Sequence, residues 1–331
     1  MRQGFCTRIS CQFLFKGLMK KMKAYSIFDD FPQTSISLLE QNGIEVDILP
    51  KGQPRPSGSA LKQLLDEYDI LFISTAQKMA EDMFADITVP KIIGTASSGI
   101  DHIKIPEHKK GLIRIANAVY ANRSTVTEHT FGLILSLRKQ LIEGRKTAFS
   151  GKTKKDMSAK PKDLMNSVMG VVGAGGIAST VLRMAKSFGM KCLCWTLHPE
   201  NHAALQNEGV EFVNLDTLLS ESDVISVNIP YSGQTENLVN AERVNLIKDD
   251  AVFITTSRVE VTDKKALFEK AHQYKSFGLG MDVDAANVQG LWTEDMYNVI
   301  ITPHIGGGTV ESRIRLFNEC SENVIKLIKQ K

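Results

Sequence analysis

The sequence predicts an α/β protein built from two doubly wound parallel-sheet domains. Its 331 residues suffice for two domains at roughly 100–200 residues each. From Met22 onward, short apolar runs alternate with helical patterns, and this alternation is interrupted once, by a polar segment at 143–162. Because strands separated by helices pair in parallel through crossover connections, each half is expected to form its own sheet.

The first half contains five strand patterns and two helical patterns. The strands are expected at 23–28, 45–49, 69–74, 91–95 and 112–117, and the helices at 33–42 and 60–66. Gly43 is a stop signal for the first helix, and the loop 51–58 is rich in proline and glycine. These elements fit one small sheet from Met22 to about Tyr120.

Residues 1–21 form a basic extension ahead of this sheet. Their apolar part is broken by Lys16 and no small-residue cleavage site follows, so they do not match a signal peptide. No stretch approaches the roughly 18 apolar residues of a membrane helix, so no membrane association is expected. We expect that the translation start was assigned too early and that the first domain begins at Met22.

A long helix and a basic segment separate the two halves. Thr125 and Glu128 have the spacing of a capping box ahead of the apolar run 131–137, which predicts a helix start at Thr125. Residues 143–162, here called the arm, carry seven Lys and Arg residues. A solvated surface arm or a subunit-contact loop is favoured over a docking site for an acidic partner.

The second half repeats the alternation. Strands are expected at 167–172, 191–196, 222–229, 251–256, 276–281 and 298–302, and helices at 175–188, 216–220 and 310–329. In the first of these helices, Ile177, Val181, Ala185 and Phe188 fall on one face, and Gly189 follows as a stop signal.

The composition excludes some classes of partner. The chain is 43% apolar and 23% charged, and its formal net charge of +3 is too small to predict binding to nucleic acid or to an anionic membrane. The five cysteines have neither zinc-site nor redox-motif spacing. We therefore expect reduced thiols, a cytoplasmic protein and no metal site.

The most informative local motif runs from Gly173 to Ala178. It follows a predicted strand and opens a predicted helix, the context in which a glycine-rich turn binds a dinucleotide. Gly173 permits the tight turn, Gly175 the close approach of a pyrophosphate, and Ala178 the close packing of helix on strand. With the N–H groups of the helix start, the motif predicts a Rossmann cofactor domain.

The next strand ends without the acid that usually binds the ribose hydroxyls. Thr196 stands at that place and does not repel a 2′-phosphate as a carboxylate would, and His198, two residues later, is a candidate partner for one. No arginine is present there to bind one. The sequence allows NAD or NADP, with a slight preference for NADP.

Three further clusters follow strands of the second half. Thr255–Arg258 ends with an arginine that can grip a carboxylate through two hydrogen bonds. Asp282 ends the next strand, and His304 follows a third strand and precedes the three glycines Gly306–Gly308. Ligands of doubly wound sheets bind at the carboxyl ends of strands, and histidine is a natural proton donor to a carbonyl oxygen. Arg258 and His304 are therefore the candidate working pair.

These clusters, in this order, resemble the D-isomer-specific 2-hydroxyacid dehydrogenase family, which includes glycerate, phosphoglycerate, D-lactate and formate dehydrogenases. The resemblance extends over nearly the whole chain from Met22, through the segments 98–102, 127–129, 173–178, 222–230, 256–258, 282–283 and 302–304. It implies a flavodoxin-like substrate domain, 22–121 and 305–331, and an inserted Rossmann dinucleotide-binding domain, 122–304. It also implies a homodimer formed through the cofactor domains, with the arm at the interface.

The resemblance further implies roles for single residues. Arg258 matches the arginine that binds the substrate carboxylate and carbonyl, and His304 matches the acid/base histidine. Ser98 and Gly99 match the backbone loop that holds the carboxylate, and Asn122 matches the substrate-binding asparagine of formate dehydrogenase. The implied cofactor contacts are Gly173, Gly175, Gly176, Ile177, Thr196, Pro230, Thr235, Thr256, Ser257, Asp282 and Gly306.

Three positions depart from the family pattern. Val259 follows the arginine where glycine is usual, and Thr196 replaces the ribose-binding acid. Asn287, five residues after Asp282, stands in the place of the catalytic glutamate. We count it with the catalytic residues, because an amide can orient the His304 ring, but it adds no charge that would favour a protonated histidine.

The preferred function is hydride transfer between a nicotinamide cofactor and a small 2-hydroxy or 2-oxo acid. A formate-dehydrogenase-like enzyme is the second hypothesis, since that enzyme has glutamine at the glutamate position and needs no proton transfer. Against it, the Pro-Phe segment near the formate pocket has no counterpart around 75–77. The third hypothesis is a weakly catalytic cofactor-binding sensor, which Val259 and Asn287 favour and the retained pair Arg258 and His304 disfavours.

Overall fold

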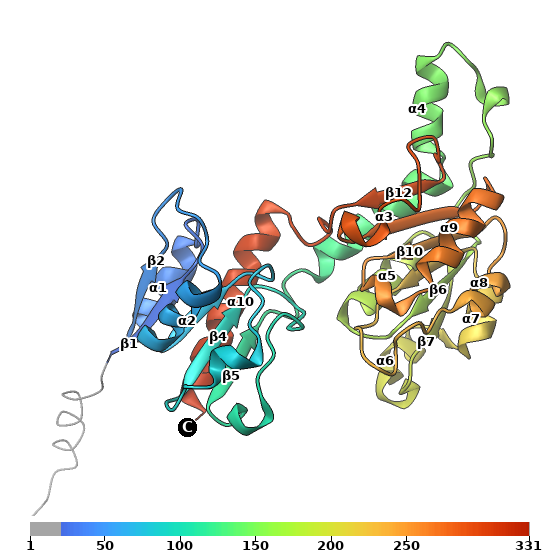
Figure 1. Cartoon of the computed structure of the whole chain (residues 1–331). Helices are drawn as coiled ribbons and strands as arrows, with labels where there is room; N and C mark the ends of the chain where they lie inside the picture. Colours follow the sequence, from blue (N-terminus) through green and yellow to red (C-terminus); the bar gives the residue numbers. More distant parts are fainter. Residues whose placement is uncertain (1–20, 331) are drawn as a thin grey trace, which may run out of the picture. The chain divides into compact units, whose positions relative to one another are not determined.

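The computed structural model describes residues 21–330 (Figure 1), so the predicted extension lies, except for its last residue, outside the described residues. The chain divides into two compact units. Of the described residues, unit 1 contains 21–118 and 316–330, and unit 2 contains Val119–Arg315. The boundaries expected from the sequence were 121/122 and 304/305.

Unit 1 is built on a five-stranded parallel sheet. Its strands are β1 (Met22–Ser26), β2 (Ile44–Ile48), β3 (Ile70–Ile73), β4 (Lys91–Thr95) and β5 (Ile113–Asn117). Their order is β2-β1-β3-β4-β5, which is the flavodoxin-like order. Its central strands β3 and β4 are buried along their whole length, as expected for strands covered on both faces.

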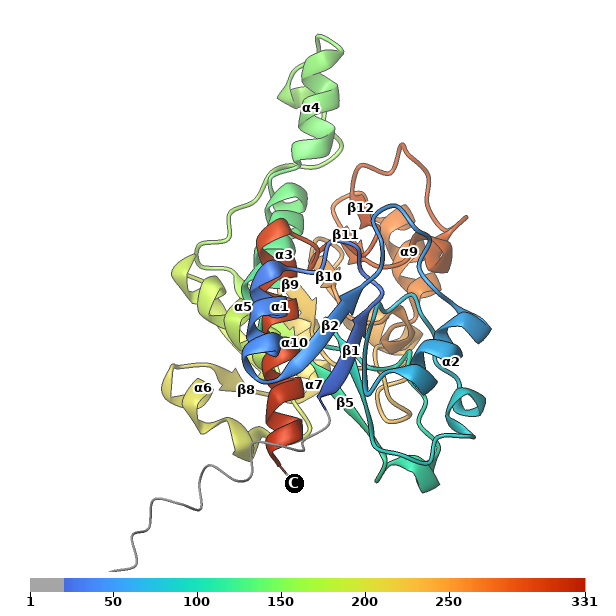
Figure 2. The same cartoon turned by 90° about the vertical axis from the view of Figure 1, so that its left-hand side faces the viewer.

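Helices cover both faces of this sheet. The helices are α1 (Gln33–Gln41), α2 (Gly58–Glu67) and the later part of α10 (Val310–Lys329), with short 3-10 turns η1 (Glu81–Phe84) and η2 (Glu107–Lys109). α1 and α10 lie side by side (Figure 2), and the hydroxyls of Thr34 and Ser35 both donate to Asn318 Oδ1 at 2.8 Å. Phe317 of α10 packs edge-on against Phe28 and Phe31. The C-terminal helix is thereby part of the first core.

Unit 2 is built on a seven-stranded parallel sheet. Its strands are β6 (Val168–Val172), β7 (Lys191–Trp195), β8 (Glu211–Phe212), β9 (Val224–Val227), β10 (Val252–Thr255), β11 (Gly278–Asp282) and β12 (Val299–Thr302). The order β12-β11-β10-β9-β6-β7-β8 is the Rossmann order extended by one strand. The predicted fold class is confirmed.

Two apolar cores lie on the two faces of this sheet. The helices of unit 2 are α3 (Arg123–Arg138), α4 (Leu141–Phe149), α5 (Gly176–Ser187), α6 (Ala203–Asn207), α7 (Leu215–Glu221), α8 (Ala241–Leu246) and α9 (Lys264–Gln273). One core takes Leu137 from α3 and Val181 from α5, and the other takes Leu218 from α7 and Leu267 from α9. α3 and α5 are therefore packed on the same side of the sheet.

The predicted capping box was wrong. α3 begins at Arg123, so Thr125 lies inside the helix, where it is buried. Its hydroxyl accepts a hydrogen bond from Arg315 Nη2 at 2.9 Å. The Thr125 hydroxyl, which the local spacing predicted to cap the helix, makes a tertiary hydrogen bond instead.

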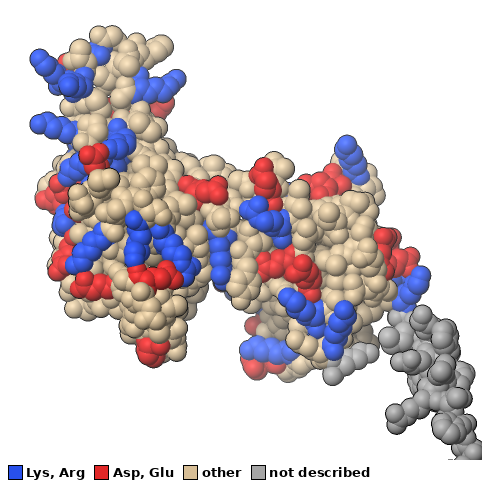
Figure 3. Space-filling view, turned by 180° about the vertical axis from the view of Figure 1, so that it is seen from behind, with Lys and Arg blue, Asp and Glu red and all other residues tan. Residues whose placement is uncertain are grey.

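The arm contains regular structure that the sequence did not predict. α4 leads into it and projects from unit 2 (Figures 1 and 2), and a 3-10 turn, η3 (Lys154–Asp156), follows. Acidic and basic side chains are interspersed over the face in Figure 3, and basic ones gather on the arm. Between residues 21 and 330, no helix combines the length and the apolar character needed to cross a membrane.

Candidate active site

The glycine-rich turn joins β6 to α5. Gly173 has φ +110°, and a Cβ there would come within 2.6 Å of the Asn228 carbonyl oxygen, so the position requires glycine. At Gly175, the residue that precedes α5, an added Cβ would meet no heavy atom within 4 Å. Ala178 is fully buried. The turn therefore opens onto unfilled space at the start of a 12-residue helix, a place that suits a pyrophosphate.

The segment after β7 carries a carboxylate, Glu200, that the sequence spacing did not single out. Thr196 is half-buried and His198 is exposed. His198 Nδ1 lies 3.2 Å from Glu200 Oε1, and Glu200 is exposed as well. The histidine considered as a partner for a 2′-phosphate thus already has an acidic neighbour.

Pro230 and Thr235 are brought together in the loop after β9. The Thr235 side chain is buried, and its hydroxyl donates to the Pro230 carbonyl at 2.8 Å while it accepts from the Ser232 N–H at 2.8 Å. These bonds define the shape of the loop.

Arg258 follows β10 and is half-buried. Two residues after the strand ends, the Ser257 hydroxyl donates to the Val227 carbonyl at 2.9 Å, which ties the ends of β9 and β10 together. Val259, the residue in the place of the family's glycine, starts the 3-10 turn η5 (Val259–Val261) and is 4% exposed within the core. The Val259 side chain therefore packs in the core of unit 2 and does not fill the candidate active site.

Asp282 holds the segment that carries His304. Its carboxylate is 3% exposed and accepts from Thr302 Oγ1 at 2.6 Å, from the Ile305 N–H at 2.8 Å and from the Gly306 N–H at 2.7 Å. His129 of α3 adds a contact, with Nε2 at 2.9 Å from Thr302 Oγ1. A buried carboxylate at the end of β11 therefore fixes the loop after β12.

His304 itself has an uncommon backbone conformation. Its φ is +55°, its N–H donates to the Thr302 carbonyl at 2.9 Å, and its side chain is exposed. A left-handed conformation costs a residue with a Cβ on the order of 1 kcal/mol and persists only where the surroundings enforce it. The hydrogen bonds to Asp282 on either side of His304 provide that enforcement.

Asn287 is not brought to His304 in the described structure. It lies exposed in the 3-10 turn η6 (Ala285–Val288), and its carbonyl accepts from Lys264 Nζ at 2.6 Å. Within residues 21–330, no hydrogen bond joins the side chains of Asn287 and His304. The catalytic role of Asn287 stays a prediction.

In unit 1, the loop with Ser98 and Gly99 is held by its own neighbours. Asn117 Nδ2 donates to the Ser98 carbonyl at 2.9 Å, and the Ser97 hydroxyl donates to the Gly99 carbonyl at 2.7 Å. Thr95 Oγ1 lies 2.9 Å from Ser97 Oγ. Side chains of β4, β5 and the loop thus fix the backbone on which carboxylate binding was predicted.

The start of α3 lies against both glycine-rich segments of unit 2. A Cβ on Gly307 would come within 3.3 Å of Asn122 Nδ2, and one on Gly306 within 3.0 Å of the His129 ring. Arg123 lies against Gly176. Sequence reasoning missed Arg123 and His129 as site residues, because only tertiary packing brings α3 to these turns.

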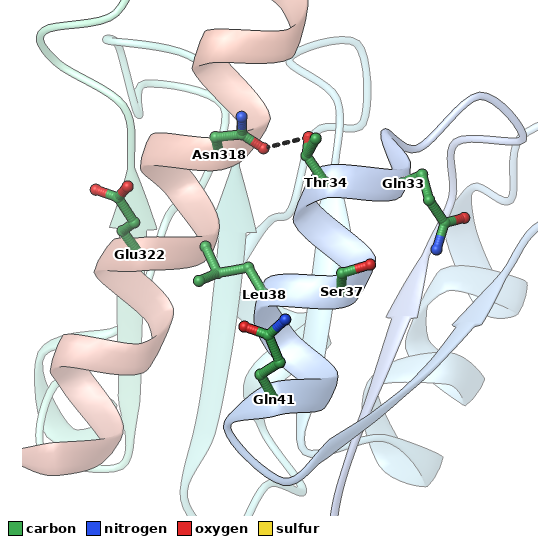
Figure 4. Close-up of a pocket in the computed structure, with 7 residues that line it drawn as sticks. All are labelled: Gln33, Thr34, Ser37, Leu38, Gln41, Asn318 and Glu322. Atoms are coloured by element: carbon green, nitrogen blue, oxygen red, sulfur yellow. Dashed lines mark hydrogen bonds between the residues drawn. The ribbon is translucent and has the colours of Figure 1, made fainter.

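A groove lies between α1 and α10 in unit 1 (Figure 4), and none of the predicted site residues lines it. Its lining is polar except for one leucine, and comprises Gln33, Thr34, Ser37, Leu38, Gln41, Asn318 and Glu322. In the described part of the chain, no three His, Cys, Asp or Glu side chains gather as ligands for a metal.

Fold and site together define a pyridine-nucleotide-dependent oxidoreductase with two doubly wound units. Comparison with known proteins specifies it further. Residues 131–306 match the NAD-binding domain of the D-isomer-specific 2-hydroxyacid dehydrogenases. A hydroxypyruvate reductase from Thermotoga maritima is 31% identical over 273 residues, which cover 80% of this chain and 87% of that protein.

Two further relatives agree with that match. A glyoxylate reductase from Pyrococcus furiosus is 27% identical over 303 residues, 89% of each chain. The crystal structure of a D-lactate dehydrogenase from Aquifex aeolicus, complexed with NAD and lactic acid, has a TM-score of 0.74 and 28% identity, covering 93% of this chain and 94% of that one.

The chain belongs to the D-isomer-specific 2-hydroxyacid dehydrogenase family, which confirms the resemblance seen in the sequence. It is an NAD(P)-dependent oxidoreductase that acts on the CH–OH group of a small 2-hydroxy acid, or on the matching 2-oxo acid in reverse.

Proposed function

We propose that the enzyme is a reductase of small 2-oxo acids in which Arg258 and His304 form the working pair. The observation that carries the proposal is the buried Asp282 network, which holds His304 in a strained conformation at the end of β12. Arg258 follows β10, so both residues stand at the carboxyl edge of the sheet whose β6 opens the glycine turn. Relatives named hydroxypyruvate reductase and glyoxylate reductase support the substrate class.

The residues of this chain divide the work as follows. Arg258 binds the carboxylate and polarises the carbonyl of the 2-oxo acid, and the backbone of Ser98 and Gly99 contributes N–H groups to the carboxylate. The nicotinamide, when bound, supplies the hydride. His304 donates a proton to the carbonyl oxygen, and Asp282 keeps its loop in place. Asn122, at the start of α3, contributes to substrate binding.

The cofactor is held by the glycine turn and by residues at or just after the ends of β7, β9, β10, β11 and β12. The contacts are those implied by the sequence: Gly173, Gly175, Gly176, Ile177, Thr196, Pro230, Thr235, Thr256, Ser257, Asp282 and Gly306. A slight preference for NADP is proposed from Thr196. The Glu200 carboxylate beside His198 opposes a 2′-phosphate and limits that preference. A measured preference of more than about tenfold for NAD would contradict it.

The test of the proposed reaction is a substrate panel. Glyoxylate, hydroxypyruvate, pyruvate and longer 2-oxo acids are each assayed with NADH and with NADPH, and formate oxidation is assayed with NAD and NADP. Turnover of one or more 2-oxo acids, with a KM that rises strongly in Arg258→Lys, supports the proposal, because lysine lacks the bidentate geometry. Formate oxidation alone, or cofactor binding without any turnover, would contradict it in favour of the alternative functions.

We also propose that the enzyme is a cytoplasmic homodimer formed through its cofactor domains. On α4, Leu141, Ile142 and Phe149 are 54%, 45% and 90% exposed, a set of apolar side chains that fits a subunit interface. Cys192, Cys194 and Cys320 are buried free thiols, in keeping with a reducing compartment. Light scattering tests the dimer: Phe149→Glu is expected to yield monomers, and a wild-type monomer would refute the assembly.

A further inference from the structure

Arg123, the first residue of α3, places its guanidinium over the start of α5. An ideal Cβ on Gly176 would lie 2.0 Å from Arg123 Nε and 2.1 Å from Cζ. Gly176 is the first residue of α5 and follows Gly175 of the glycine turn. The guanidinium occupies the space that any larger residue at position 176 would need.

The guanidinium is positioned by its neighbours but its charge is not neutralised by them. Its Cζ lies 4.1 Å from the centroid of the Tyr120 ring, and Nε makes one long hydrogen bond, 3.4 Å, to the Val119 carbonyl. A guanidinium has five N–H donors. Within residues 21–330, no carboxylate lies within ion-pairing distance of Arg123, so most of its donors are available to a ligand.

The electrostatics of this arrangement favour an anion. A helix N-terminus carries a partial positive charge, so a cation beside it is unfavourable unless an anion shares the site. Arg123 puts a full positive charge at the N-terminus of α5, next to the open space above Gly175. The N–H groups of α5 and the guanidinium therefore form one anion-binding surface.

We propose that Arg123 is a binding residue for the diphosphate bridge of the dinucleotide cofactor. The other anionic groups of the reaction have different places in the fold. A 2′-phosphate belongs at the end of β7, near Thr196, and the substrate carboxylate belongs to Arg258 after β10. The glycine turn itself has no side chain at position 176. Arg123 supplies from α3 a positively charged group that can donate two hydrogen bonds to the diphosphate.

The test is binding of NADH, ADP and adenosine to wild type and to Arg123→Ala, without substrate. NADH is titrated directly, and ADP and adenosine compete with it. Loss of the guanidinium is expected to lower the affinity for NADH and for ADP about tenfold each, and the affinity for adenosine less than about twofold. Arg123→Lys keeps the charge without the bidentate geometry and should fall between.

Lys186→Ala is the matched control. Lys186 is exposed at the other end of α5, so its removal changes the net charge equally and should leave the affinity for NADH within about twofold. Melting temperatures establish that each variant is folded.

A mutant cycle with Gly176→Ala tests the geometry itself. In the wild-type background the new methyl group must push Arg123 away, so NADH affinity should fall several-fold. In the Arg123→Ala background the space is open, and the same change should have an effect of less than about twofold. Equal effects in both backgrounds would contradict the placement of Arg123 over Gly176.

Two results would overturn the proposal: NADH affinity unchanged in Arg123→Ala, or NADH weakened with ADP unchanged, which would place Arg123 elsewhere on the cofactor. The inference rests on the proposed function only through the cofactor. If the cofactor binds but no substrate is turned over, the proposed reaction is contradicted and the role of Arg123 in cofactor binding is not. The two Arg123→Ala results above would contradict the role of Arg123 alone.

Discussion

The two glycine-rich segments of unit 2 lie at the same edge of its sheet, but different interactions hold them in their conformations. The turn Gly173–Ala178 follows β6, and the segment Thr302–Gly308 begins at the last residue of β12, both at the carboxyl edge of one sheet. The first turn is shaped by its own backbone, through the positive φ of Gly173. The second is shaped by a carboxylate from another strand, since Asp282 accepts three hydrogen bonds from it.

This difference decides what sequence can predict. A turn made by local backbone geometry has a spacing that can be recognised, as the motif at 173–178 was. A loop held by long-range hydrogen bonds has no such spacing, so Asp282 and His304 were matched to a family pattern without the hydrogen bonds that join Asp282 to the loop carrying His304. The start of α3 touches both segments, through Arg123 and His129, and neither was predicted.

The largest expected effect is a loss of stability that distinguishes two glycines of the first turn, Gly173 and Gly175. Gly173→Ala puts a Cβ against the Asn228 carbonyl at a positive φ, and should lower the free energy of unfolding by about 3 kcal/mol or more. Gly175→Ala places its methyl group in open space, so stability should change by less than about 1 kcal/mol, while NADH affinity falls. Chemical denaturation measures the stability of both variants, and NADH titration measures their affinity for the cofactor. Equal loss of stability in both would remove the distinction.

Asp282→Asn tests the second segment. An amide can accept on one side only, so at least one buried donor of Thr302, Ile305 or Gly306 loses its partner, with a loss of about 1–3 kcal/mol. Turnover should fall with it, because the loop that carries His304 is released. Glu294→Gln, at an exposed position, is the control for charge. A variant with wild-type stability and turnover would show that Asp282 does not hold this loop.

Val259→Gly asks whether a departure from the family pattern matters for stability or for the site. The valine side chain is 4% exposed in the core, so its removal should cost about 2 kcal/mol and leave NADH affinity unchanged. Thermal unfolding and NADH titration distinguish the two roles. Improved turnover at unchanged stability would instead place the valine in the active site.

The smallest expected effect concerns Asn287. Restoring a carboxylate, Asn287→Glu, should favour protonated His304 if the two side chains meet during the reaction, so reduction should persist to higher pH. Gln289→Glu adds the same charge at an exposed neighbouring position and should leave the profile of kcat against pH unchanged. Identical profiles for all three proteins would exclude a role for position 287 in proton transfer.

Much of the fold was predictable from the alternation of apolar runs. The two parallel sheets were predicted, and the C-terminal helix has the predicted bounds. α9 was missed because its buried residues, Leu267, Phe268 and Ala271, are embedded in a Lys-rich segment without a clear apolar stripe. α4 was missed because it projects from the unit and buries little apolar surface, so the periodicity of a packed helix is absent.

The candidate site was predictable to the extent that its residues follow strand ends. Arg258 and His304 do so, and the sheet order brings those strand ends to one edge. Asn287, by contrast, was placed by counting from Asp282, and the structure shows it exposed and bonded to Lys264. Counting along the chain fixes positions, but only packing decides which side chains meet.

The most direct test of the working pair is reduction of glyoxylate and hydroxypyruvate by wild type and His304→Ala, with NADH binding measured in both. A positioned acid contributes about 10²–10⁴-fold to turnover, so kcat should fall in that range while NADH affinity stays unchanged. Equal rates in the two proteins, whether substantial or negligible, would contradict proton donation by His304.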